Sequence, residues 1–146
     1  MEKKIYGLLG RKLGHSFSPE IHAALADYDY RLIELKHDEL ADFFKNGSFD
    51  ALNVTIPYKE AVIPYLNALS PTAAKIGAVN TIVRDGNGLL YGHNTDCEGL
   101  SALLRANSIS PLNKKVLILG SGGAAKAATC VIEEMGGTPV IVSRKG

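Results

Sequence analysis

Short apolar runs alternate with amphipathic segments along this chain, and this pattern is typical of an α/β protein. Apolar runs of about five residues predict buried strands, and segments whose apolar residues lie three and four apart predict helices. Over the first hundred residues the predicted strands are 5–9, 30–35, 51–56, 78–83 and 88–92. The predicted helices are a segment that begins at Ser18, residues 38–45, a segment that begins at Pro57, and residues 95–106. We therefore expect an α/β fold with a mainly parallel sheet.

Local signals support several of these elements. Ser18-Pro19-Glu20 offers a serine cap, a proline at the first helical position and an acid in the first turn. Asp38 is the expected cap of the next helix. The helix from Pro57 is supported by apolar residues at helical spacing, namely Ala61, Val62, Tyr65, Leu66 and Leu69. Asp85-Gly86-Asn87-Gly88 predicts a hairpin between the strands on either side of it.

The end of the chain carries a second pattern. An apolar strand over residues 115–119 runs directly into the sequence G-S-G-G-A-A, and a helix over 124–135 and a strand over 138–142 complete one βαβ unit. Strand, glycine-rich turn and helix in this order open a dinucleotide-binding domain of the Rossmann type. A complete domain of this type needs two such halves, so we expect the unit to be incomplete in this chain.

The glycine-rich turn supplies the expected nucleotide contacts. Gly120 permits the tight turn, Gly122 lets the backbone approach a pyrophosphate, and Ala125 lets the helix pack closely against the strand. Lys126, in the first helical turn, adds positive charge near the pyrophosphate. The expected contacts from the turn are Gly120, Gly122, Gly123, Ala124, Ala125 and Lys126.

The end of the following strand indicates which nucleotide binds. An acid about 20 residues after the turn would hold the ribose of NAD, but this strand ends in Ser143-Arg144-Lys145, which has two cations and no acid. A guanidinium binds phosphate as a fork of two donors. The sequence therefore favours the 2′-phosphate of NADP, with Ser143, Arg144 and Lys145 around it.

Composition excludes several classes of function. The chain has 146 residues, of which 46% are hydrophobic and 21% charged, with a net charge of +1. No cluster of lysine and arginine with interleaved aromatics occurs, so we expect no nucleic acid partner. No window reaches the about 20 apolar residues of a membrane span, and the apolar stretch at the N-terminus is too short for a signal peptide. We expect a cytoplasmic protein without a membrane partner.

Cysteine and histidine spacing gives no sign of a metal. Cys97 and Cys130 lie 33 residues apart without a second pair, so we expect two reduced, partly buried thiols. The histidines are scattered, and none forms a pair with metal-ligand spacing; they are His15, His22, His37 and His93. We expect His22 to pack on a helix face.

Polar residues gather where the strand over 51–56 ends. Asn53, Thr55 and Lys59 lie in the sequence N-V-T-I-P-Y-K, at the carboxyl end of that strand, where open α/β sheets bind ligands. Lys59 would fall in a first helical turn, where the helix dipole disfavours a cation. An anionic partner or ligand would explain it, and a solvated surface lysine is the alternative.

Other polar positions have structural explanations of their own. Thr95 and Glu98 fit a capping box, which would leave Asp96 as a favourable acid at a helix N-terminus, and spacing alone favours this over a pair with Lys59. Ser18 is explained as a cap, whereas Ser16 is not, and two hydroxyls at a helix start suit an anion such as a carboxylate. Asn80, on a strand, needs partners or a ligand for its amide.

Taken together and in this order, these segments resemble the shikimate dehydrogenases. The resemblance spans nearly the whole chain and rests on G-H-S-F-S-P-E-I-H, N-V-T-I-P-Y-K, G-A-V-N-T-I, G-H-N-T-D-x-x-G, G-S-G-G-A-A and S-R. It implies NADPH-dependent, reversible reduction of 3-dehydroshikimate to shikimate in aromatic amino-acid biosynthesis. It also implies a shikimate-binding catalytic domain over residues 1–100 and the start of an NADP-binding domain over residues 101–146.

The resemblance assigns roles to the polar positions. Lys59 and Asp96 become the catalytic pair, with Lys59 protonating the carbonyl oxygen as hydride arrives. Ser16 and Ser18 would bind the substrate carboxylate. The residues implied to hold the ring hydroxyls are Asn53, Thr55, Asn80 and Asp96.

Departures from the family pattern leave alternatives open. Ser143-Arg144-Lys145 stands where the family has N-R-T, and the family continues well beyond residue 146. We therefore expect a piece of a longer enzyme or a shortened relative, whose unfinished nucleotide unit is covered by self-association. A module that binds shikimate or quinate without turnover is one alternative, and a quinate dehydrogenase or a folate-linked dehydrogenase is another.

Overall fold

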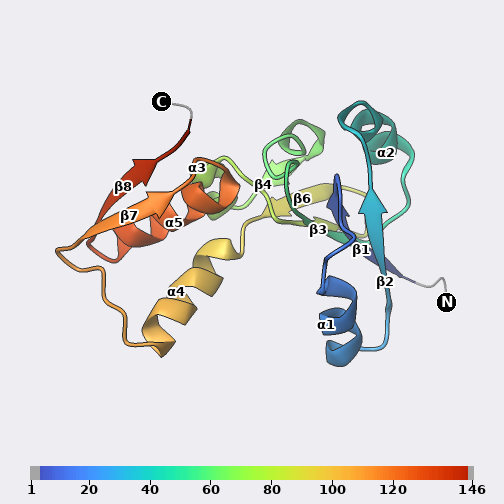
Figure 1. The fold of residues 1–146 in the computed structure, drawn as a ribbon. Helices are drawn as coiled ribbons and strands as arrows, with labels where there is room; N and C mark the ends of the chain where they lie inside the picture. Colours follow the sequence, from blue (N-terminus) through green and yellow to red (C-terminus); the bar gives the residue numbers. More distant parts are fainter. Residues whose placement is uncertain (1–3, 145–146) are drawn as a thin grey trace.

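Two sheets form the framework of the protein in the computed structural model, which describes residues 4–144 (Figure 1). The larger sheet has six strands in the order β2-β1-β3-β5-β6-β4. Its strands are β1 (Ile5–Gly10), β2 (Asp29–Glu34), β3 (Ala51–Val54), β4 (Ala68–Leu69), β5 (Thr81–Arg84) and β6 (Leu90–His93). The smaller sheet pairs β7 (Lys115–Leu119) with β8 (Thr138–Val142). The predicted α/β class is confirmed.

Strand pairing is mostly parallel, as expected. β1 runs parallel to both β2 and β3, β4 runs parallel to β6, and β7 runs parallel to β8. The antiparallel pairs are β3 with β5 and β5 with β6. The predicted hairpin at Asp85–Gly88 joins β5 to β6, and the Asp85 carboxylate accepts the backbone N–H groups of Asn87 and Leu89 there.

Five α-helices and two short 3-10 helices lie around these sheets within the described residues. The α-helices are α1 (Ser18–Leu25), α2 (Leu40–Asn46), α3 (Pro71–Ile76), α4 (Asp96–Ala106) and α5 (Gly123–Glu134). The 3-10 helices are η1 (His37–Glu39) and η2 (Ile63–Tyr65).

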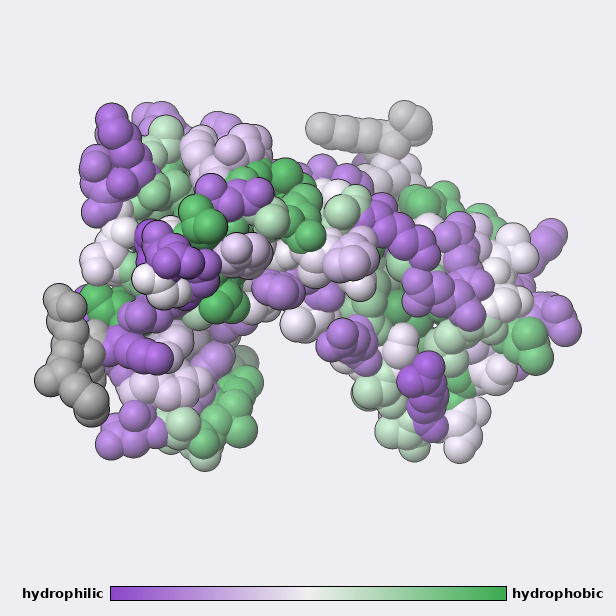
Figure 2. Space-filling model, turned by 180° about the vertical axis from the view of Figure 1, so that it is seen from behind, coloured by the Kyte–Doolittle hydropathy of each residue, from purple (hydrophilic) through white to green (hydrophobic). Residues whose placement is uncertain are grey.

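Two buried clusters organise the molecule. The first lies under the six-stranded sheet and includes Leu9, Leu52, Val62 and Ile82. The second joins α3, α4 and α5 and contains Ile76, Ala78, Cys97, Ala127, Cys130 and Val131. Because β7 and β8 contact α5, this second cluster attaches the small sheet to the large one. Figure 2 shows the resulting two lobes from behind, with a hollow between them.

The helix expected from Pro57 does not form. Residues 57–62 make turns, a 3-10 helix covers Ile63–Tyr65, and the chain then enters β4. The reason is Pro64, which lies inside the expected helix, lacks a backbone N–H and would clash with the carbonyl four residues earlier. The apolar residues of this segment, Val62 among them, are still buried in the main cluster, although not on a helix.

Three helix starts also differ from their expected caps. α1 begins at Ser18 itself, so Ser18 is not the cap, and its N–H donates to the Ser16 hydroxyl. Asp38 lies inside η1, and the N–H of Lys36 donates to Glu39 there. Thr95 precedes α4 without a side-chain cap bond in the described structure, and its hydroxyl bonds to Asn80. Asn94 accepts the N–H of Asp96.

The sequence patterns missed α3 and β4. Ser70 caps α3 by accepting the N–H of Ala73, Pro71 follows at the first position, and Gly77 ends the helix with a φ of 67°. This is the usual serine, proline and glycine order of a short helix. The sequence contains all three signals, but the helix expected from Pro57 extended to Leu69, directly before them, and left no room for a separate short helix.

One face of the small sheet is apolar and exposed. Leu117 is 61% exposed and Leu119 77%, and their partners in register, Val140 and Val142, are also exposed. This is the surface from which we expected self-association, which stays a prediction. No helix within residues 4–144 is long and apolar enough to cross a membrane.

Candidate functional site

An ion pair between Lys59 and Asp96 lies where the two lobes meet. Lys59 follows β3 in a turn, and Asp96 is the first residue of α4. The Lys59 Nζ lies 2.6 Å from the Asp96 Oδ2, with the lysine side chain 17% exposed and the aspartate 32%. The expected first helical turn at Lys59 is wrong, but the expected anionic partner is present. Because the Lys59 and Asp96 side chains are only partly buried, a ligand can reach both of them.

Asp96 is held by two asparagines. The Asn80 Nδ2 donates to the Asp96 Oδ1 at 2.8 Å, which leaves Oδ2 directed at Lys59. The Asn94 Oδ1 accepts the N–H of Asp96 at 3.0 Å, and its Nδ2 donates to the Ala78 carbonyl at 2.9 Å. The carboxylate therefore has a fixed orientation before any ligand arrives.

Asn94 is the residue that sequence reasoning missed here. It is 4% exposed and is the one buried polar side chain within residues 4–144. It belongs to the G-H-N-T-D segment, in which the sequence assigns roles only to Thr95 and Asp96. A buried amide needs partners, and both of its polar atoms have one. The signal available in the sequence was an asparagine between the end of a strand and the start of a helix.

Asn80 also binds the segment in front of α4. Its Oδ1 accepts the N–H of Thr95 at 3.0 Å, and its Nδ2 lies 3.0 Å from the Thr95 hydroxyl. The amide that was expected to need partners therefore finds them in Thr95 and Asp96. This network joins the large sheet to the start of α4.

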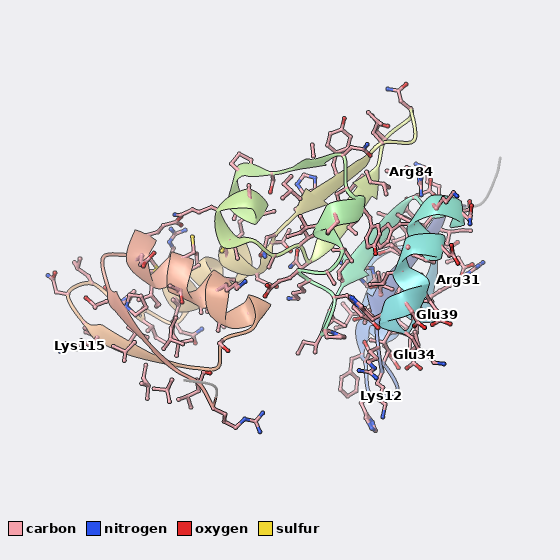
Figure 3. The ribbon with its side chains drawn as sticks, turned by 90° about the horizontal axis from the view of Figure 1, so that it is seen from above. Lys12, Arg31, Glu34, Glu39, Arg84 and Lys115 are labelled. Atoms are coloured by element: carbon pink, nitrogen blue, oxygen red, sulfur yellow. The ribbon has the colours of Figure 1, made fainter. Side chains whose placement is uncertain are left out.

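The two serines meet at the start of α1. The Ser16 hydroxyl lies 3.1 Å from that of Ser18, and it accepts the N–H of Ser18 at 3.2 Å. Ser16 thus has a local bond that the sequence did not indicate. With Thr55 they line a pocket of about 730 Å³, together with Leu13, His15 and Glu34 among others. Figure 3 shows Lys12, another lining residue, close to Glu34 at the end of the large sheet opposite Arg84.

A second pocket adjoins this one through Thr55. It measures about 610 Å³ and is lined by Thr55, Lys59 and the glycine-rich turn from Gly120 to Ala125. This second pocket therefore brings Thr55 and Lys59 of the large lobe next to the glycine-rich turn of the small lobe, whereas the serines line the first pocket.

Asn53 lies on β3 and is bound by a residue that the sequence did not point to. The Tyr30 hydroxyl, on β2, donates to the Asn53 Oδ1 at 2.7 Å. Burial raises the pKa of Tyr30 to about 12. A tyrosine on a strand of alternating polar and apolar residues is usually interpreted as a packing residue, so the sequence pattern gives no role to the Tyr30 hydroxyl.

The glycine-rich turn has the geometry that a dinucleotide needs. Gly120 has a φ of 124°, in the region that favours glycine. Helix α5 begins at Gly123, and a Cβ added there would lie 3.3 Å from the Cδ of Lys59. The free N–H groups at the start of α5 can bind phosphate. The absence of a side chain at residue 123 therefore lets this helix end approach Lys59 closely.

A third pocket extends from the turn to the end of β8. It measures about 610 Å³ and is lined by Leu119, Gly120, Ser121, Val142, Ser143 and Arg144. Arg144 is exposed, so its guanidinium is available to a ligand phosphate. The N–H groups at the start of α5 and the Arg144 guanidinium are both of a kind that can bind phosphate. Lys145 lies outside the described residues.

Lys126 lies at the end of the first turn of α5, as expected, but it has an acidic partner that the sequence did not indicate. It is the fourth residue of α5, and its Nζ lies 2.8 Å from the Glu60 Oε2, in the other lobe. Its charge is thus compensated by a carboxylate, and its role at a pyrophosphate stays a prediction. Lys75 and Glu134 make a similar exposed pair at 2.8 Å across the same junction.

The remaining candidates are structural. Cys97 and Cys130 are both free and buried, more fully than expected, and burial raises the pKa of the Cys97 thiol to about 11. Within residues 4–144 no three histidine, cysteine or acidic side chains gather as a metal site. His22 does not simply pack on its helix: it stacks on the ring of Tyr30, with the centroids 3.7 Å apart.

Comparison with known proteins agrees with this arrangement. The model of the shikimate dehydrogenase substrate binding domain matches residues 8–82. The chain belongs to this family. A shikimate dehydrogenase (NADP(+)) from Clostridium beijerinckii is 41% identical over 151 residues, which cover 97% of this chain and 56% of the relative. The chain thus spans about half the length of the curated relatives that it matches.

Solved shikimate dehydrogenases share the fold. Shikimate dehydrogenase 1 from Peptoclostridium difficile superposes with a TM-score of 0.90 at 37% identity and covers 98% of this chain and 57% of its own. The enzyme from Thermus thermophilus in complex with NADP(H) and shikimate gives a TM-score of 0.81 at 31% identity, over 97% of this chain and 56% of its own. Both lobes of this chain are thus found in enzymes of the family.

Proposed function

We propose that this chain acts in the NADPH-dependent, reversible reduction of 3-dehydroshikimate to shikimate. On this proposal residues 1–100 bind the substrate and residues 101–146 begin the NADP-binding part. The observation that carries the proposal is the Lys59–Asp96 pair, held at 2.6 Å beside a glycine-rich helix start. Support comes from the relatives, which are named shikimate dehydrogenase (NADP(+)).

The chemistry requires a hydride and a proton. NADPH, when bound, supplies the hydride to the carbonyl carbon. The Lys59 ammonium donates a proton to the carbonyl oxygen, which becomes the hydroxyl of shikimate, and in the reverse direction the neutral amine accepts that proton. As charge develops on the oxygen, the nearby ammonium also stabilises it.

Asp96 keeps Lys59 in place for this transfer. One of its oxygens is held by Asn80, so the other faces the ammonium in a fixed direction. Asp96 also has the partial exposure needed to accept a hydroxyl of the substrate. Asn53, Thr55 and Asn80 would contact the remaining ring hydroxyls, and Ser16 and Ser18 the carboxylate.

NADP rather than NAD is favoured by the residues at the end of β8. Arg144 follows the strand at the rim of the third pocket, and no acid is present in the pocket to hold a ribose with two free hydroxyls. The arginine provides charge-assisted bonds to a phosphate.

A direct assay separates catalysis from binding alone. Oxidation of NADPH is followed in the presence of 3-dehydroshikimate, and shikimate binding is measured in parallel by calorimetry. Substrate-dependent oxidation that is lost in Lys59→Ala supports the proposal. Shikimate binding without any oxidation would support a binding module instead, and a preference for quinate would support the quinate dehydrogenase alternative.

A further inference from the structure

Tyr30 binds a candidate substrate ligand, Asn53, that lies on a different strand. It is on β2, whereas Asn53 is on β3, and β1 lies between these strands in the sheet. Tyr30 pairs in register with Tyr6, which pairs with Ala51, so Tyr30 and Asn53 project from the same face of the sheet. The tyrosine side chain reaches across β1 to make its 2.7 Å bond with Asn53.

The Tyr30 phenol remains a hydrogen-bond donor at neutral pH. An ordinary tyrosine pKa of 10.0 already keeps the proton in place there, and burial raises the pKa of Tyr30 further, to about 12. The Asn53 Oδ1 therefore faces a protonated donor at 2.7 Å.

Aromatic contacts hold the Tyr30 ring in place. His22, from α1, stacks on it with an interplanar angle of 14°, and the His22 Nδ1 makes a hydrogen bond with the Tyr28 hydroxyl. Tyr28 in turn contacts the ring of Tyr6 at 4.8 Å between centroids. A ring fixed on this side has little freedom, so the position of its hydroxyl is defined by the fold.

We propose that Tyr30 is a positioning residue for substrate recognition, which orients the Asn53 amide. The Asn53 Oδ1 is occupied by Tyr30, and its Nδ2 is thereby directed as a donor toward a hydroxyl oxygen of the ligand. This inference rests on the proposed function, because it takes Asn53 to contact a polyhydroxylated cyclic acid.

The first test needs no ligand. The side-chain NH2 signals of Asn53 are identified in the NMR spectrum by their loss in Asn53→Ala, and are then compared between the unmodified protein and Tyr30→Phe. We expect Tyr30→Phe to shift these signals and to increase the mobility of the amide. Tyr65→Phe is the matched control, since the Tyr65 ring stacks on Phe44 away from the pockets. Unchanged Asn53 signals in Tyr30→Phe would overturn the inference.

The second test measures shikimate affinity. Loss of one neutral hydrogen bond should raise the Kd of shikimate in Tyr30→Phe about fivefold to tenfold, and Tyr65→Phe should change it less than about twofold. In Asn53→Ala, the further change Tyr30→Phe should cost less than about twofold, because the two residues act as a unit. If Tyr30→Phe raised the Kd of shikimate as much in Asn53→Ala as in the unmodified protein, the inference would be overturned. A protein that does not bind shikimate at all would contradict the proposed function, and the NMR comparison would still decide the role of Tyr30.

Discussion

The Lys59 Nζ lies 2.6 Å from the Asp96 Oδ2, although 37 residues separate the two in the chain. Lys59 comes from a turn after the third strand of the large sheet, and Asp96 begins the helix that leads to the other lobe. Their meeting point is therefore also the junction of the two lobes, beside the glycine-rich turn. On the proposed function, the Lys59 ammonium would thus lie where a substrate bound in one lobe meets a nucleotide bound in the other.

Lys59→Ala should abolish turnover while leaving substrate binding largely intact. We expect kcat to fall at least about 100-fold, because the ammonium acts mainly in the transition state, and the Kd of shikimate to stay within about tenfold. Lys75→Ala is the control, since Lys75 makes an exposed ion pair and does not line the pocket that Lys59 lines, and this variant should keep its rate within about twofold. Equal losses in binding and in rate would make Lys59 a ground-state ligand.

Arg144→Ala should weaken NADP far more than NAD. A charge-assisted bond to the 2′-phosphate predicts a loss of about tenfold to hundredfold in NADP affinity, and NAD affinity should change less than about twofold. Fluorescence titration with both nucleotides measures this. Arg105→Ala, in the last turn of α4, is the control for loss of an exposed arginine. The same loss for both nucleotides would contradict the 2′-phosphate assignment.

Sequence patterns predicted some elements residue by residue. The strands over 115–119 and 138–142 agree with β7 and β8, because each is an apolar run bounded by turn-forming or polar residues. The helix predicted after Pro57 is wrong, because the apolar periodicity continues through Pro64, which an α-helix interior does not tolerate. The main core still contains its apolar residues, so hydrophobic pattern predicted burial there better than it predicted local conformation.

The site was predictable only in part, since spacing along the chain says little about distance between elements. Spacing favoured Asp96 as an acid at a helix N-terminus over an ion pair with Lys59, and the fold produced the pair. Asn94 and Tyr30 act through partners on other segments, Ala78 and Asn53 respectively. Contacts of this kind depend on strand order and register, which composition and periodicity do not determine.

Asn94→Ala should destabilise the junction of the lobes. Its buried amide bonds to the Ala78 carbonyl and to the N–H of Asp96, so the change leaves buried polar groups without partners. We expect the free energy of unfolding to fall by about 1–3 kcal/mol in urea titrations. Asn46→Ala, at the exposed end of α2, should change it by less than about 0.5 kcal/mol. Equal stability of the two variants would refute this account of Asn94.

Two glycine substitutions should have opposite effects on stability. Gly99 lies inside α4 with open space around it, so Gly99→Ala should raise the free energy of unfolding by about 0.5–1 kcal/mol. Gly77 also has open space, but its φ is 67° at the end of α3, so Gly77→Ala should lower it by about 1 kcal/mol. Thermal unfolding of both variants measures this. Changes of the same sign would show that backbone conformation does not decide these positions.

Stability should fall in alkaline solution partly through Tyr30. Its pKa is raised from 10.0 to about 12 by burial, so the unfolded state loses this proton first as the pH rises. The contribution of the buried phenol is therefore complete below about pH 10 and is lost as the pH approaches about 12. Urea unfolding across this interval should show a shallower decline in Tyr30→Phe than in the unmodified protein. Parallel declines of stability in the two proteins would show that Tyr30 does not contribute to the loss of stability at high pH.

Calorimetric titration with shikimate, without nucleotide, tests the central claim most directly. The account predicts saturable binding at one site per chain, weakened in Asn80→Ala, because Asn80 orients Asp96 and faces the same junction. Circular dichroism establishes that each protein used is folded. Absence of binding by the folded, unmodified protein would contradict the claim that Ser16, Asn53, Lys59 and Asp96 form a substrate site.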